Sequence, residues 1–137
     1  MATVTATVRS LTGTHAAVVR AGSHTLVADR ADGVVGGMGL GFNGAQLLAS
    51  AIGGCLANDV QVVAADEGVD LETVAIDVAV VVDGTSVLDG LRIAGADLRV
   101  RLTAADGADT SRVVQRALAI SAVLASVREG FPVQVVD

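Results

Sequence analysis

Lysine, tryptophan and tyrosine are absent from the 137 residues, and only two phenylalanines occur. A chain this poor in aromatic side chains offers no platform on which single-stranded bases could stack. The nine basic residues are all arginines, are scattered along the chain and are outnumbered by 15 acidic residues, giving a formal net charge of −6. Binding to a phosphate backbone needs clustered positive charge. The composition therefore argues against a nucleic-acid-binding protein.

Cysteine and histidine, the residues that most often bind soft metal ions, are scarce: the chain has one cysteine, Cys55, and two histidines. A single cysteine excludes an intrachain disulfide and fits a reducing, cytoplasmic compartment. The start of the chain, MATVTATVRSLTG, has no apolar stretch preceded by basic residues, so we expect no signal peptide. His15 and His24 show no paired spacing with Cys55, so we expect no metal site.

Charge is missing altogether from residues 33–58, a segment long enough to suggest a membrane span. Half of the chain's 16 glycines lie in this segment, and its flanking residues are Asp32 and Asp59 rather than arginines. Both features are unfavourable for a transmembrane helix. We therefore expect no membrane association.

Small apolar residues are what the chain has in abundance, with 52% hydrophobic residues overall. This composition predicts one globular domain over residues 1–137, with a core of Val, Ala, Leu and Ile. Alternating patterns predict a three-stranded antiparallel start from residues 2–9, 16–20 and 24–28. The glycine-rich segment 29–44 has no periodicity and is expected to be a loop that brings its backbone close to another group.

Residues 45–67 show the strongest periodicity, with apolar residues at helical spacing and Gly68 placed to end a helix. This helix is apolar nearly all round, so we expect it to be buried on most sides, in the middle of the domain or of an oligomer. Strands are predicted at 71–82, 91–102 and 132–136, and a second helix at 110–127. The order β-β-β-α-β-β-α-β is that of an α+β fold.

Gly39 to Gly44 match the pattern G-x-G-x-x-G of dinucleotide-binding turns. That turn requires a strand entering the glycines and an acidic residue about 20 positions later. Here the following helix alone is about that long, and the next strand ends at Asp83. We interpret the segment as a loop that enters a helix, and we expect no nucleotide cofactor.

Cys55 is the residue best placed for chemistry, although an isolated buried cysteine is usually a small core residue. It follows Gly53 and Gly54, and each glycine inside a helix costs roughly 1 kcal/mol relative to alanine. Some backbone or ligand should therefore approach closely beside the sulfur. Asp59, one helical turn later, opposes formation of the thiolate. An arginine from elsewhere in the fold would be needed to activate the thiol.

These segments resemble the OsmC/Ohr family, whose members read G-P-N-P, then E-L-L-L-A-A-L-G-G-C, then a helix that ends in Gly and a hydrophobic residue. The matching runs are Ala28-Asp29, Gly36 to Gly39, Gly41 to Gly44, Leu47 to Cys55 and Gly68 to Leu71. Phe42 and Gly44 replace both prolines of the first motif. The resemblance implies an intertwined homodimer with long central helices, and thiol-based reduction of hydroperoxides at the dimer interface.

Carried over by position, the resemblance makes Cys55 the catalytic, peroxide-reducing cysteine. The carboxylate that positions an arginine in the family is replaced by Ala45 or Gln46, and Ser121 stands where many members have a second, resolving cysteine. Gln46, Ser121 and Phe42 are accordingly expected to line the site. The arginine candidates are Arg9, Arg20 and Arg30, and the sequence does not choose among them.

Two functions follow from this combination of retained and missing residues. The first is one-cysteine reduction of an organic hydroperoxide at Cys55, with an external thiol as reductant and no other cofactor. The second is a non-catalytic protein that binds a small apolar ligand in the groove at the dimer interface, lined by Leu40 and Phe42. The retained Gly-Gly-Cys favours the enzyme, whereas the missing carboxylate and second cysteine favour the binding protein.

Overall fold

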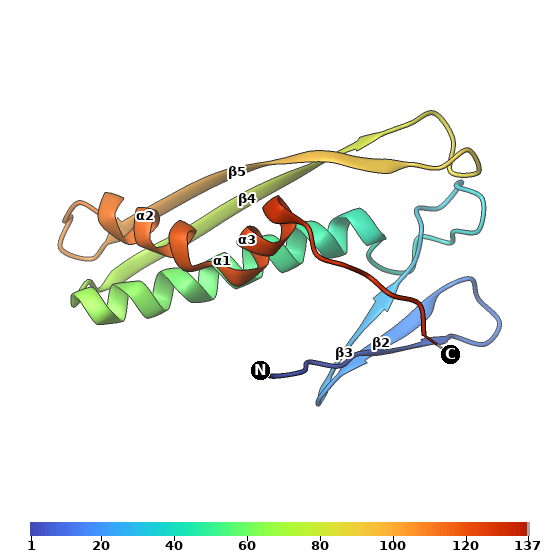
Figure 1. The fold of residues 1–137 in the computed structure, drawn as a ribbon, viewed down its shortest axis with the longest axis horizontal. Coiled ribbons are helices and arrows are strands. Elements are labelled where there is room, and N and C mark those ends of the chain that lie inside the picture. The colour runs from blue at the N-terminus through green and yellow to red at the C-terminus, as the bar shows by residue number, and fades with distance from the viewer. Residues whose placement is uncertain (137) are drawn as a thin grey trace. The chain divides into compact units, whose positions relative to one another are not determined.

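The computed structural model of the chain describes residues 1–136. They form two compact units. The first unit contains residues 1–48 and 82–94, and the second contains residues 49–81 and 95–136. The element order is β-β-β-α-β-β-α-α, which is an α+β fold (Figure 1).

An antiparallel meander makes up the first part of the first unit. β1 (Thr7–Ser10), β2 (Ala17–Ala21) and β3 (His24–Ala28) pair in sequence order, with Val18 opposite Val27. The predicted three-stranded start is confirmed. The first strand is shorter than the predicted range 2–9, and the second is displaced by one residue from 16–20.

The loop after β3 returns to that strand, which identifies the group that its glycine-rich backbone approaches. The Phe42 N–H donates to the Val27 carbonyl at 3.0 Å, and the Asp29 N–H donates to the Phe42 carbonyl at 2.9 Å. A Cβ atom at Gly41 would collide with the Val27 carbonyl. Glycine is therefore required at position 41 so that the loop can lie against the strand.

α1 (Gly44–Glu67) begins at a reciprocal cap. The Gln46 N–H donates to Asn43 Oδ1, and the Asn43 N–H donates to Gln46 Oε1, both at 2.9 Å. This is a capping box, which satisfies two backbone donors at a helix start. At the other end, Gly68 adopts φ +68° and the Val69 N–H donates to the Ala64 carbonyl. The helix predicted at 45–67 is confirmed with nearly the same bounds.

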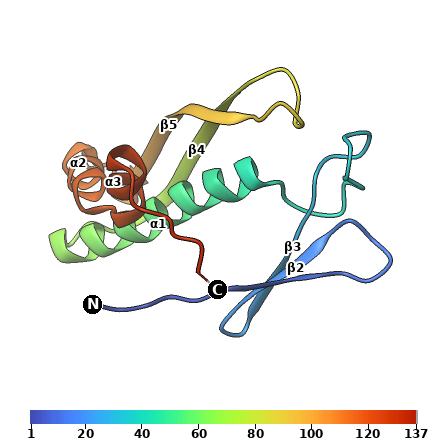
Figure 2. The same cartoon turned by 45° about the vertical axis from the view of Figure 1, so that its right-hand side comes forward.

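The core of the second unit is built on one face of α1. Its buried residues come from α1 and from α2 (Ser111–Ile120): Leu56, Val60, Val63, Ala64, Val113 and Ala117. β4 (Leu71–Asp83) and β5 (Arg92–Ala104) form a two-stranded sheet, and Val74, Ile76, Leu98 and Val100 pack against this core. Figures 1 and 2 show both helices along one side of the strands.

α1 is buried on fewer sides than its composition predicts. Its fully buried residues are Ile52, Leu56, Val60, Val63 and Ala64, while Val62 is 63% exposed. By length and composition α1 could cross a membrane. The core helix of a soluble protein passes the same test, and five residues of α1 are buried in this structure.

Two predictions for the end of the chain are wrong. The helix expected at 110–127 is divided into α2 and α3 (Ala122–Glu129), because Ser121 adopts an extended backbone with φ −65° and ψ 108°. The strand expected at 132–136 does not form, and residues 131–136 are irregular and exposed. Despite their alternating apolar pattern, these residues pair with neither of the two sheets.

Candidate functional site

Cys55 lies in the middle of α1 and is half-buried. Its S–H donates to Asp59 Oδ2 at 3.5 Å, because residues four apart on a helix share a face. Ser121 approaches the same sulfur from the break between α2 and α3, and its hydroxyl donates to Cys55 Sγ at 3.7 Å. The sulfur is thus held between an acceptor and a donor, both within the second unit.

Ser121 is 0% exposed, so its hydroxyl is fully shielded from solvent. A buried hydroxyl is costly unless it has a hydrogen-bond partner, and here the partner is the thiol sulfur. The backbone supports this placement, since the Ser121 N–H still donates to the Ala117 carbonyl at 3.1 Å. The structure therefore brings Ser121 to the position that a second cysteine would need.

The two glycines before Cys55 have different surroundings. A Cβ atom on Gly53 would lie 3.2 Å from Cγ2 of Val78 on β4, which is tighter than most side-chain contacts. A Cβ atom on Gly54 would meet nothing within 4 Å. A shallow hollow of about 290 Å³ lies over them, lined by Ala49, Ser50, Gly53, Gly54, Ile76 and Val78. The close neighbour at Gly53 is therefore a side chain of β4, and not the backbone or ligand that the sequence predicts.

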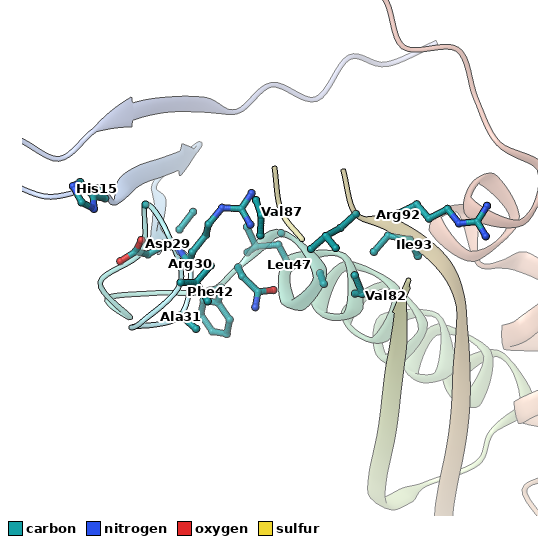
Figure 3. Close-up of a pocket in the computed structure, with 17 residues that line it drawn as sticks. His15, Asp29, Arg30, Ala31, Phe42, Leu47, Val82, Val87, Arg92 and Ile93 are labelled. Carbon is teal, nitrogen blue, oxygen red and sulfur yellow. Dashed lines mark hydrogen bonds between the residues drawn. The ribbon is translucent and has the colours of Figure 1, made fainter. Parts of the chain in front are cut away.

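A larger cavity of about 680 Å³ lies within the first unit. Figure 3 shows the residues around it, which come from the β1–β2 turn with His15, the loop after β3, the start of α1 and the β4–β5 turn. Its apolar lining includes Val34, Phe42, Leu47, Val82, Val87 and Ile93. Arg30 lines it as well, and its side chain extends toward Val87 in Figure 3. Arg92 is already paired with Asp83 at 2.8 Å.

Asp29 organises the loop that forms one wall of this cavity. It is 7% exposed, and its carboxylate accepts backbone N–H groups of Leu40 at 3.0 Å, Arg30 at 2.8 Å and Met38 at 3.1 Å. The hydrogen bond from Leu40 is the main cause that lowers the pKa of Asp29, against the opposing effect of burial. Sequence reasoning missed this role, although an acidic residue directly before a glycine-rich loop is a signal for it.

The residues predicted to line the site fall into two groups. Cys55 and Ser121 meet in the second unit, whereas Phe42 and Arg30 line the cavity of the first unit. Gln46 is exposed and forms the capping box with Asn43.

The three candidate arginines all belong to the first unit, whereas Cys55 belongs to the second. Of these, Arg9 donates to its neighbour's carbonyl, that of Val8, at 2.9 Å. Among residues 1–136, no cluster of three or more His, Cys, Asp or Glu side chains could hold a metal ion.

The chain matches the family model described as OsmC-like protein over residues 37–136. This range contains the glycine-rich loop, α1 with Cys55, and the break at Ser121. No curated protein shows a significant match to the chain.

Solved structures of similar fold cover nearly the whole chain. An OsmC-like protein of unknown function from Vibrio cholerae has a TM-score of 0.75 at 11% identity, covering 92% of this chain and 94% of the other. An organic hydroperoxide resistance protein OsmC from Legionella pneumophila has a TM-score of 0.68 at 22% identity, covering 93% and 90%. OhrB, the organic hydroperoxide resistance protein of Bacillus subtilis, has a TM-score of 0.61 at 18% identity, covering 92% and 90%. These likenesses and the family match identify the chain as a member of the OsmC-like family.

Proposed function

We propose that this protein is a one-cysteine hydroperoxide reductase that acts slowly at Cys55. The observation that carries the proposal is the buried Ser121 hydroxyl, which donates to the sulfur of a half-buried cysteine. A donor at this position stabilises negative charge on the sulfur, and the thiolate is the nucleophile in such reactions. The names of the Legionella and Bacillus proteins support the choice of organic hydroperoxides as substrates.

In the first step, the thiolate sulfur of Cys55 attacks the terminal oxygen of the hydroperoxide. The O–O bond breaks, and the alkoxide takes up a proton and leaves as an alcohol. Cys55 is oxidised to a sulfenic acid while the hydroperoxide is reduced. An external thiol then attacks the sulfenic sulfur and releases water, and a second thiol frees Cys55 and carries away the external disulfide. A reducing, cytoplasmic environment would supply these thiols.

The proposed rate is low because activating groups are missing or already engaged. Ala45 has no carboxylate, and the Gln46 side chain accepts the Asn43 N–H in the capping box. Cys55 is the only cysteine, so no intrachain disulfide can form. Asp59 places a carboxylate 3.5 Å from the sulfur, where it opposes negative charge.

We further propose that the chain functions as a homodimer packed through α1. Ser50, Gly54, Asn58, Gln61 and Val62 are exposed on this helix in the single chain. The open space at Gly54 would allow a second backbone to approach closely. A dimer would also offer Cys55 an arginine from the partner, with Arg9, Arg20 and Arg30 as candidates.

The cavity of the first unit supports a second candidate function, the binding of a small apolar ligand without catalysis. Its volume of about 680 Å³ falls in the usual range for ligand sites, and Phe42 and Leu47 are among the residues of its apolar lining. Uptake of an environment-sensitive apolar dye, weakened by Phe42→Ala, would support this function.

Consumption of cumene hydroperoxide with dithiothreitol, compared between the wild-type protein and Cys55→Ser, tests the enzyme. We expect slow consumption by the wild type, none above background by Cys55→Ser, and trapping of the sulfenic acid at Cys55 by dimedone. Both proteins should give the same circular dichroism spectrum and the same oligomeric state. If the wild type is no faster than Cys55→Ser, the enzyme is excluded and ligand binding becomes the leading function.

A further inference from the structure

We propose that Asp59 is a positioning residue that protects Cys55 from irreversible oxidation. It would do so by placing a carboxylate beside the sulfur, where it opposes negative charge both on the thiol and on the sulfenic acid. The inference rests on the proposed function and concerns the regulation of that same site. Asp59 lies one turn after Cys55 on α1, and its Oδ2 accepts the thiol proton's hydrogen bond at 3.5 Å.

The charge of Asp59 is directed at the sulfur rather than at a cation. The other acidic residues near the end of α1 have arginine partners: Glu67 pairs with Arg112 and Arg116, and Asp66 pairs with Arg116. On β4, Asp77 pairs with Arg101 at 2.7 Å. Within residues 1–136, the Asp59 carboxylate takes part in none of these ion pairs, and its hydrogen-bond partner is the Cys55 thiol.

This arrangement affects two successive oxidation steps in the same direction. Both steps need an anionic sulfur group, the thiolate in the first and the sulfenate in the second. In the second, the sulfenate sulfur attacks the terminal oxygen of another hydroperoxide molecule, the O–O bond breaks, and an alcohol leaves after taking up a proton. The product is a sulfinic acid, which ordinary thiols do not reduce. A carboxylate beside the sulfur slows both steps.

Protection matters more in this chain than in a protein with two cysteines. A resolving cysteine removes the sulfenic acid quickly by forming a disulfide, but the residue facing Cys55 is Ser121. The sulfenic acid must therefore survive until an external thiol arrives. In its protonated form, its O–H can donate to Asp59 while its oxygen accepts from the Ser121 hydroxyl.

Asp59→Asn tests the inference, because it removes the charge and keeps the size and a hydrogen-bond acceptor. Asp97→Asn on β5 is the matched control. Asp97 is exposed, and its substitution makes the same change in net charge at a residue that does not contact Cys55. Each protein is treated with increasing cumene hydroperoxide. Mass spectrometry then measures the fractions of Cys55 that are trapped by dimedone and oxidised to the sulfinic acid. The alkylation rate of Cys55 by iodoacetamide is measured in parallel.

We expect Asp59→Asn to be alkylated about fivefold faster or more, the factor that two unit charges about 4 Å apart impose even in bulk water. We also expect it to accumulate more sulfinic acid than the wild type at equal hydroperoxide, while Asp97→Asn matches the wild type. Asp59→Glu, which keeps the charge, should remain close to the wild type, and Asp59→Ser provides a second uncharged variant should Asp59→Asn fold poorly.

Equal sulfinic fractions in the wild type and in the uncharged variants would overturn the role of Asp59. Failure of the proposed function has a different signature. In that case the wild type shows neither hydroperoxide consumption nor a dimedone adduct.

Discussion

The hydroxyl of Ser121 donates a hydrogen bond to the sulfur of Cys55 at 3.7 Å, although the two residues are 66 positions apart in the chain. The contact joins the break between α2 and α3 to the middle of α1. It places an unreactive side chain where a thiol could resolve an oxidised cysteine. Because both residues lie in the second unit, the contact depends on the packing of that unit alone.

Replacing Ser121 by cysteine should therefore create a resolving residue. We expect Ser121→Cys to form an intrachain disulfide with Cys55 after mild oxidation, because a disulfide requires Cα atoms within about 7 Å and side chains directed at each other. Non-reducing electrophoresis and peptide mass mapping would detect it. Ser121→Ala is the control, and a Ser121→Cys protein that keeps two free thiols after one equivalent of hydroperoxide would contradict this geometry.

Gln46→Glu should restore a carboxylate without disturbing the start of α1. A glutamate at this position can accept the Asn43 N–H as Gln46 does, and a negative charge in the first helical turn is favourable by about 0.3–1 kcal/mol. We expect thermal stability equal to or slightly above that of the wild type, and faster hydroperoxide consumption if one of the three candidate arginines reaches Cys55.

Asn43→Ala is the matched variant for the Gln46→Glu experiment, because it removes the cap without adding charge. It should lower the free energy of unfolding by about 0.5–2 kcal/mol. A Gln46→Glu protein that is less stable than the wild type would contradict the capping role.

Asp29→Asn should loosen the glycine-rich loop. The carboxylate oxygens accept three backbone N–H groups, and an amide would direct its own NH₂ group at some of these donors. Faster amide exchange at Met38 and Leu40, followed by NMR or mass spectrometry, would report the change. Unchanged exchange at both positions would argue against the organising role of Asp29.

The lowered pKa of Asp29 makes the stability of the folded protein depend on pH. This pKa is lowered in the folded state, chiefly by the hydrogen bond from Leu40, so the folded protein binds the proton less readily than the unfolded chain. The stabilisation is complete above the usual pKa of 3.8 and is lost as the pH falls through the lowered folded-state value. The stability difference between the wild type and Asp29→Asn, measured by urea unfolding, should therefore shrink on acidification. A difference that grows at low pH would contradict this sign.

Gly54→Leu tests the proposed dimer. In the single chain a side chain at position 54 enters open space, and removing a helical glycine favours the helix by up to about 1 kcal/mol. If a second α1 packs there, the larger side chain should instead shift sedimentation toward the monomer. Gly95→Leu, at another open glycine, serves as control. A wild-type protein that sediments as a monomer at micromolar concentration would exclude the dimer.

Local patterns in the sequence were sufficient for most of the secondary structure. α1 was predicted within one residue, because its apolar spacing is helical and Gly68 supplies the positive φ at its end. β3 was predicted with its observed bounds, since a short β-prone run follows the turn at Gly22. These features depend on neighbours in the chain, which a sequence displays directly.

Tertiary contacts decided the rest. The segment 110–127 has a continuous helical pattern, yet it breaks at Ser121, whose side chain is buried against Cys55. Residues 132–136 have a β pattern but remain irregular, because a strand forms only where its backbone groups pair with a neighbour, and this segment pairs with neither sheet. In the sequence, Asp29 is one of 15 acidic residues. Its role is seen only in the folded loop, where its carboxylate accepts three backbone N–H groups. The sequence alone determined most of the helical and extended segments, because these depend on neighbours in the chain, whereas the break at Ser121 and the positions of polar atoms around Cys55 and Asp29 follow from long-range packing.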